Sequence, residues 1–115
     1  MEYKSIVLAF LISLVVAHAH AQTIACDSAK NYVGKNVTVC GKITSAHTSK
    51  EGIMFLNFGD KYPNQTFTVY IPASKTDGNT EANFTDKTVC VTGTIKLYKD
   101  KPEIQVSDLK QIDLR

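Results

Sequence analysis

A strand pattern that occurs twice constrains this chain more than any other feature of its sequence. The segment at 37–43 reads VTVCGKI, and the segment at 89–95 reads VCVTGTI. When they are aligned on Gly41 and Gly93, apolar residues fall at every second position, as in a β-strand with one buried face. A glycine inside such a strand is typical of a bulge or a sharp bend. Two such strands in a small chain predict a sheet that curls into a barrel.

Turn-forming residues divide the rest of the chain into further strands. The five predicted strands span residues 35–47, 53–59, 65–71, 88–97 and 102–107. A short helical turn, capped by Asp27 or Ser28 and ended by Gly34, precedes them. The polar stretch at 73–86 has Phe84 as its only large apolar residue. Five strands with an insertion between the third and fourth predict an all-β fold, the five-stranded Greek-key OB-fold barrel. An SH3-type barrel is the alternative, but it does not readily explain the insertion.

The N-terminus has the pattern of a secretory signal peptide. Lys4 precedes an apolar run at 6–17, and Ala19-His20-Ala21 places small residues at the two positions that a signal peptidase reads. We expect cleavage before Gln22, which divides the chain into a signal peptide, 1–21, and a single OB-fold domain, 22–115. The predicted location is therefore secreted or periplasmic, where disulfides are stable.

The overall charge of the chain is nearly balanced. Its 115 residues include 13 basic and 11 acidic residues, a formal net charge of +2. Cleavage before Gln22 removes one residue of each sign, Glu2 and Lys4, and leaves the net charge unchanged. This balance neither requires nor excludes a polyanionic partner, so the position of the charges decides the question.

Several motifs together resemble one known family. The most specific are LNFG at 56–59 and YPNQ at 62–65, joined by the repeated strand pattern and by LYKDKPEI at 97–104. This series resembles a family of small exported bacterial OB-fold proteins, similar to the OB domains of the tRNA and helicase type, with relatives attached to nucleases. The resemblance covers nearly all of 22–115 and implies nucleic-acid binding. The family usually has a longer, helix-containing insertion between strands three and four than the one at 73–86.

The second and third predicted strands carry the expected binding face, because an OB barrel binds ligands across these two strands. If Leu56 and Phe58 face the core, alternate residues face outward. The predicted outward residues are Phe55, Asn57, Thr66, Thr68 and Tyr70. Phe55 and Tyr70 are then exposed and able to stack on bases. A slip of one residue in this register places Phe55 in the core instead.

The loops beside this face supply further candidate binding residues. Tyr62 and Tyr98 lie in turns, where an aromatic residue serves either as an anchor of the loop or as a stacking group. The lysines predicted to contact a ligand are Lys50, Lys61, Lys99 and Lys101. Acidic residues on the same side, Glu51, Asp60, Asp100 and Glu103, reduce the basic character of the face. We therefore predict weak, salt-sensitive binding of single-stranded DNA or RNA with little sequence preference. An envelope protein or glycan as the ligand, or an accessory role beside a secreted nuclease, is the alternative.

The cysteines predict a disulfide rather than a catalytic or metal site. Cys40 and Cys90 alternate with the core valines and lie on the first and fourth strands, which are neighbours in an OB-fold. A Cys40–Cys90 disulfide is the expected pairing, and a pairing of Cys26 with one of them is the alternative. The cysteines and His47 are too scattered for a zinc site.

No catalytic pattern is present in the sequence. It has no Ser-His-Asp order, paired-carboxylate motif, phosphate-binding glycine loop or metal-binding helix. His47 is the sole histidine after cleavage and is interpreted as a polar residue at the end of a strand. We expect a binding module without a cofactor, and not an enzyme.

Overall fold

The structure is a computed structural model that describes residues 21–115, and it is all-β. The strands are β1 (Gln22–Ala25), β2 (Asn36–Thr48), β3 (Met54–Gly59), β4 (Gln65–Ile71), β5 (Thr88–Thr94), β6 (Lys96–Tyr98), β7 (Lys101–Gln105) and β8 (Ile112–Leu114). Short 3₁₀ turns lie at Cys26–Asn31, Ala73–Lys75, Glu81–Asn83 and Leu109–Gln111. The predicted signal peptide lies, apart from Ala21, outside the described residues.

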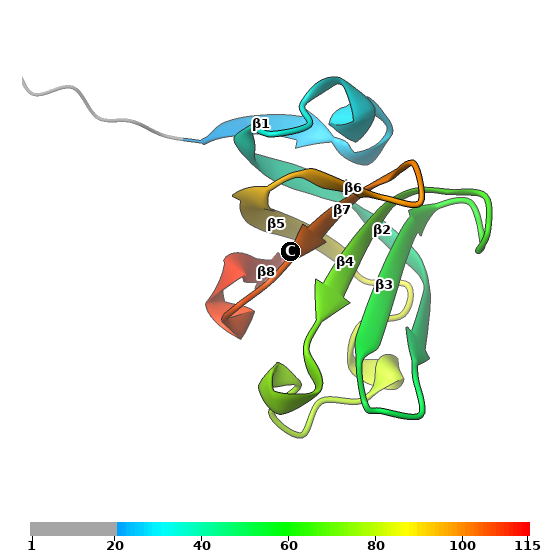
Figure 1. The fold of residues 1–115 in the computed structure, drawn as a ribbon. Coiled ribbons are helices and arrows are strands. Elements are labelled where there is room, and N and C mark those ends of the chain that lie inside the picture. The colour runs from blue at the N-terminus through cyan, green and yellow to red at the C-terminus, as the bar shows by residue number, and fades with distance from the viewer. Residues whose placement is uncertain (1–20) are drawn as a thin grey trace, which may run out of the picture.

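The strands form one sheet in the order β6-β7-β4-β3-β2-β5-β8, and β1 pairs parallel with β2 (Figure 1). The first half of β2, from Asn36 to Lys42, pairs with β5, and its second half, from Ile43 to Thr48, pairs with β3. One long strand therefore serves both parts of the sheet. The register of the β2–β3 pair shifts between Ile43 and Ser45. The parallel pairing of β4 with β7 places the last predicted strand beside the third.

The strand predicted over 88–97 is divided into β5 and β6 at Ile95. The Ile95 N–H donates to the carbonyl of Lys35 at 3.0 Å, and its carbonyl accepts from the N–H of Gly34 at 2.7 Å. The chain then leaves β2 and pairs with β7 instead. The hydrogen-bonded order does not itself close into a ring, and β1, β6 and β8 are short strands that the sequence pattern did not predict as separate elements.

The repeated strand pattern forms the centre of the core, as predicted. Its apolar positions are fully or almost fully buried: Val37, Val39, Ile43, Val89, Val91 and Ile95. The role of Gly93 differs from the expected bulge, because the register of β2 with β5 runs evenly past it. A Cβ atom on Gly93 would lie 2.6 Å from Cγ2 of Ile104 on β7. Gly93 therefore allows β5 and β7 to approach closely over the core. Phe84 is buried and anchors the segment between β4 and β5, as expected.

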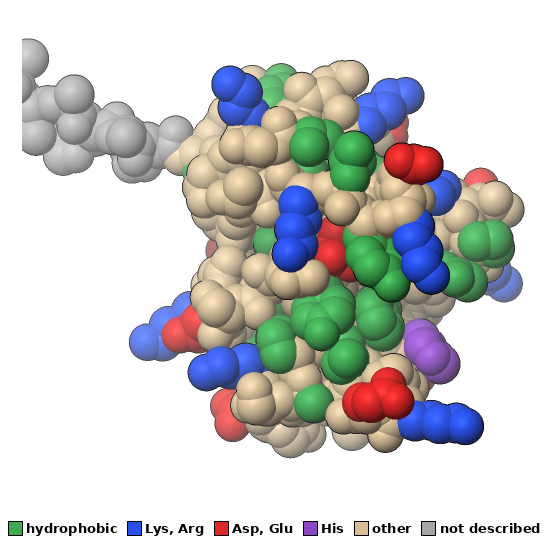
Figure 2. All heavy atoms as spheres, in the orientation of Figure 1, with side chains coloured by type: hydrophobic (Ala, Val, Ile, Leu, Met, Phe, Trp, Pro, Cys, Tyr) green, Lys and Arg blue, Asp and Glu red, His purple; other side chains and the backbone are tan. Residues whose placement is uncertain are grey.

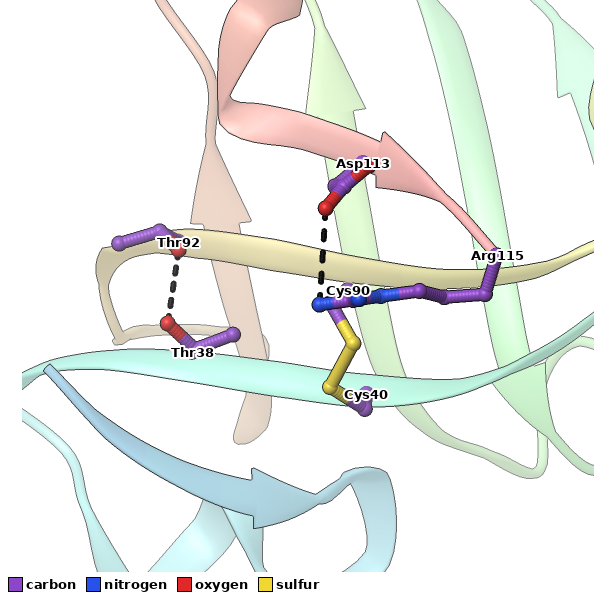
Figure 3. Close-up of a disulfide and its surroundings, with 6 residues drawn as sticks. All are labelled: Thr38, Cys40, Cys90, Thr92, Asp113 and Arg115. Atoms are coloured by element: carbon purple, nitrogen blue, oxygen red, sulfur yellow. Dashed lines mark hydrogen bonds and ion pairs between the residues drawn. A yellow bond between two sulfur atoms is a disulfide. The ribbon is translucent and has the colours of Figure 1, made fainter.

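The disulfide joins Cys40 of β2 to Cys90 of β5, which are directly paired in the sheet (Figure 3). Two positions along, the hydroxyl oxygens of Thr38 and Thr92 are hydrogen-bonded at 2.7 Å. A disulfide such as Cys40–Cys90 is typical of oxidising, extracytoplasmic environments. Cys26 remains outside the disulfide and packs against the core.

The remaining parts of the described chain differ in small ways from the expectation. The prediction that Asp27 or Ser28 caps the first turn is wrong, because both residues lie inside the turn at Cys26–Asn31 and no side chain caps its start. Leu109 and Ile112 pack against the core, whereas Leu114 is largely exposed. Between residues 21 and 115, no helix has the length and apolar character needed to cross a membrane.

Candidate ligand-binding groove

A groove of about 780 Å³ lies across β3 and β4 and extends beneath the β6–β7 hairpin. It is lined by Ser45, Ala46, His47, Phe55, Asn57, Tyr62, Pro63, Gln65, Thr68, Tyr98, Lys99, Lys101, Pro102 and Glu103. The loops of the β3–β4 and β6–β7 hairpins lie beside each other (Figure 1), and Nζ of Lys101 in one donates to the carbonyl of Gln65 in the other. Figure 2 looks onto the same side of the molecule, where hydrophobic side chains gather, with basic side chains beside them and acidic atoms between.

The walls of the groove are aromatic. Tyr62 and Tyr98 come from the two hairpins, and their side chains are 72% and 55% exposed. Phe55 lies on β3, half-buried, with its ring edge-on to Tyr70 at a centroid distance of 5.6 Å. Tyr70 supports Phe55 from outside the groove and does not line it. The exposed rings of Tyr62 and Tyr98 on the two hairpins, and the half-buried ring of Phe55 on β3, form surfaces on which flat apolar groups can stack.

The floor of the groove is polar. Within residues 21–115, the buried polar or charged side chains are Asn57, Gln65, Thr68 and Glu103, and all of them line this groove. The hydroxyl of Thr68 donates to Oδ1 of Asn57 at 3.1 Å, and Nδ2 of Asn57 donates to Oγ of Ser45 at 3.4 Å. Oε1 of Gln65 is buried without a hydrogen-bond partner. Burial of polar groups costs free energy unless they are paired, so this concentration does not serve the stability of the core.

Glu103 is the one buried carboxylate among the described residues. It lies on β7, directly opposite Thr68 of β4 on one side and Lys96 of β6 on the other. Burial raises the pKa of Glu103 above its ordinary value, and a hydrogen bond from Gln105 and the charge of Lys96 oppose this rise. The Gln105 amide Nε2 donates to Oε2 of Glu103 at 3.3 Å. The floor therefore holds a carboxylate that is costly to ionise.

Basic side chains lie at one end of the groove only. Lys99 places its Nζ 5.4 Å from the centre of the Tyr98 ring. Lys101 donates from Nζ to the backbone carbonyl of Gln65 at 3.3 Å and so bridges the two hairpins. Lys50 and Lys61 do not line the groove. Positive charge is therefore concentrated at the β6–β7 hairpin.

The structure brings together most, but not all, of the residues predicted to bind a ligand. Those that line the groove are Phe55, Asn57, Thr68, Tyr62, Tyr98, Lys99 and Lys101. Tyr70, Lys50 and Lys61 lie outside it. The register with Leu56 and Phe58 in the core is the one observed, and Asn57 and Thr68 lie on the opposite face but are buried. The lining residues that sequence reasoning did not select as ligand contacts are Ser45, Ala46, His47, Pro63, Gln65, Pro102 and Glu103.

Period-two spacing contained part of the signal for Glu103 but not for Gln65, which is in phase with the core residue Phe67. Glu103 alternates with the buried Ile104, which puts its side chain on the outer face with Thr68. Its burial depends on the hairpins that stand over that face, which strand periodicity does not describe. Within the described residues, no group of three or more His, Cys, Asp or Glu side chains is arranged to hold a metal ion.

Solved structures share this fold. The chain is similar to the OBody AM1L10, in a structure where it is bound to hen egg-white lysozyme, with a TM-score of 0.55 and 18% identity over 86% of this chain and 98% of that chain. It is similar to asparaginyl-tRNA synthetase from Pyrococcus horikoshii, with a TM-score of 0.54 and 15% identity over 83% of this chain and 23% of that chain. The hypothetical protein ygiW from E. coli gives a TM-score of 0.50 and 21% identity over 85% of this chain and 100% of that chain.

These likenesses establish an all-β, OB-like fold and nothing finer. The chain spans about a quarter of the length of the synthetase chains that it matches. No protein-family model matches the sequence. No curated protein matches it either.

Proposed function

We propose that this protein is an exported OB-fold module that binds single-stranded nucleic acid in the groove across β3 and β4. The observation that carries this proposal is the groove itself, on the face that OB barrels use for oligonucleotides, with Tyr62, Phe55 and Tyr98 along it and Lys99 and Lys101 at one end. Aromatic side chains bind bases by stacking, and lysines bind phosphates. The synthetase likeness and the sequence resemblance are compatible with such a ligand, although one fold serves many functions.

The groove fits a short segment of single strand better than a duplex. Stacking requires bases that are free of a helix, and the rings of Tyr62 and Tyr98 are both exposed to receive them. Few phosphates can be neutralised by two lysines, so affinity is expected to be modest and to fall as salt rises. The module binds without catalysing a reaction.

The proposed setting is outside the cytoplasm of a bacterium, after removal of residues 1–21. The Cys40–Cys90 disulfide supports an oxidising environment. Measurement of the mass of the exported protein tests this directly, because cleavage before Gln22 gives one defined mass. A mass that retains residues 1–21 contradicts it.

Fluorescence anisotropy tests the proposed ligand. Labelled single-stranded DNA and RNA oligomers are titrated with the purified protein at about 20 mM and about 150 mM salt, with Tyr98→Ala and the control Leu114→Ala. Tyr98 and Leu114 are both large, largely exposed apolar residues, but Leu114 lies on β8, away from the groove. Loss of one stacked base costs about 1–3 kcal/mol, so Tyr98→Ala should bind roughly 5- to 150-fold more weakly while Leu114→Ala is unchanged.

Absence of binding at low salt rejects the proposal. A protein surface or a glycan is then the next ligand to test, since the OBody structure has an OB-type chain bound to a protein. Binding that does not weaken with salt also points away from phosphate recognition.

A further inference from the structure

The segment that follows the proposed cleavage site is part of the fold. β1 begins at Gln22, the first residue after the cut, and pairs parallel with β2 from the register Gln22–Val37 onward. Ile24 is 8% exposed and belongs to the core. Trimming of the chain from a free N-terminus would remove this strand and uncover part of the core. Protection of the N-terminus therefore has structural value in this protein.

A glutamine at a free N-terminus carries its own electrophile. Once residues 1–21 are removed, the backbone nitrogen of Gln22 is an amine in the same residue as the side-chain carboxamide. Attack of the neutral amine on Cδ closes a lactam, and reactions within one molecule gain from proximity. The bond from the α-nitrogen to Cδ forms, the Cδ–Nε2 bond breaks, and Nε2 leaves as ammonia with one proton from the amine. The step needs no oxidant, reductant or second reactant.

Building on the proposed export of the chain, we propose that Gln22 is converted to pyroglutamate after residues 1–21 are removed. The product has no positive charge at its N-terminus and no free amine for an aminopeptidase to bind. Its lactam nitrogen keeps one hydrogen, as an ordinary backbone N–H does. Gln22 is exposed at the start of β1, so the ring has room there. The modification closes β1 to trimming from its end.

Tyr32 controls how readily the ring closes. Nε2 of Gln22 donates to the hydroxyl oxygen of Tyr32 at 3.2 Å, and Tyr32 packs against the core. Nε2 is the atom that leaves, so this hydrogen bond has to break before ammonia is released. The usual net strength of one hydrogen bond corresponds to a roughly 2- to 10-fold slowing of ring closure.

Intact-mass measurement of the exported protein tests the proposal. The full chain is expressed in a bacterial host, and the purified, reduced product is followed by mass spectrometry at neutral pH until its mass is constant. We expect the mass of residues 22–115 less one ammonia. Pyroglutamyl aminopeptidase should then remove the first residue and leave Thr23 at the N-terminus. Gln22→Asn is the matched control, because its carboxamide is one methylene shorter and cannot close the same ring.

Tyr32→Phe tests the control of the rate. The substitution removes the hydroxyl and keeps the ring that packs against the core. Its lactam should form roughly 2- to 10-fold faster than in the unsubstituted protein. An unchanged rate overturns the role of Tyr32.

The remaining outcomes separate the modification from the export on which it rests. A product that begins at Gln22 and keeps its full mass at the end of the incubation overturns the modification and leaves the cleavage intact. A product that retains residues 1–21, or that is cut elsewhere, rejects the proposed cleavage and the modification with it. Equal loss of ammonia in Gln22→Asn overturns the assignment of the reaction to Gln22.

Discussion

Removal of the disulfide should destabilise the protein strongly. Cys40 and Cys90 are 50 residues apart in sequence, and the loop between them contains β3, β4 and the insertion that Phe84 anchors. The loss of chain entropy on closing a loop of about 50 residues corresponds to about 4 kcal/mol at 25 °C. Small domains have a total free energy of unfolding of about 5–15 kcal/mol, so this bond accounts for a large part of it.

Urea denaturation of the purified Cys40→Ala/Cys90→Ala variant measures this contribution. We expect the free energy of unfolding to fall by about 4 kcal/mol and the slope of the transition to rise, because the unfolded chain becomes more expanded. Cys26→Ala is the control, since it removes a thiol that packs on the core but leaves the disulfide in place. A loss below about 1 kcal/mol in the double variant, with the same loss in the control, refutes the reasoning.

Other consequences of the fold and the groove can be measured separately. Gly93→Ala should cost about 1–3 kcal/mol in urea denaturation, because the new Cβ would lie 2.6 Å from Cγ2 of Ile104; an unchanged midpoint contradicts the close approach. Burial raises the pKa of Glu103 in the folded state above its value in the unfolded state. The contribution of Glu103 to the free energy of unfolding is therefore fully present below the unfolded-state pKa, and it is lost as pH rises through the folded-state pKa because the buried carboxyl group must then ionise. Glu103→Gln should therefore be more stable relative to the unsubstituted protein at neutral pH than in acid, and the opposite trend in denaturation midpoints contradicts it. Replacing Lys99 and Lys101 with alanine should lower the slope of log affinity for single strands against log salt by about 1.4, and an unchanged slope places the phosphates elsewhere.

Strand periodicity predicted most of the sheet. The apolar positions at 37–43 and 89–95 are buried as the alternation requires, and β4 has the predicted bounds. The predicted OB-fold placed Cys40 and Cys90 on neighbouring strands, and the two residues are directly paired in the sheet. The alternation of apolar and polar residues did not, however, predict where a strand ends because the chain changes its pairing partner. Ile95 is apolar and in phase, yet its backbone pairs with Gly34 and Lys35, and the strand ends there.

The groove was predictable in outline but not in its floor. The outward positions of β3 and β4 followed from the buried Leu56 and Phe58. The burial of Glu103 arises from the parallel pairing of β4 with β7 and from two hairpins over the same face, which no local pattern specifies. Tyr70 was expected to stack on a ligand, whereas its ring packs edge-on against Phe55 outside the groove.

Chemical-shift mapping tests the central claim most directly. The ¹⁵N-labelled protein is titrated with an unlabelled single-stranded cytidine oligomer, and the amide shifts are followed residue by residue. We expect the shifts to cluster on the groove, at Asn57, Thr68 and Glu103, and to leave β1 and β8 unchanged. Shifts that cluster on β1, β5 or β8, or no shifts at saturating oligomer, contradict the assignment of this groove as a nucleic-acid site.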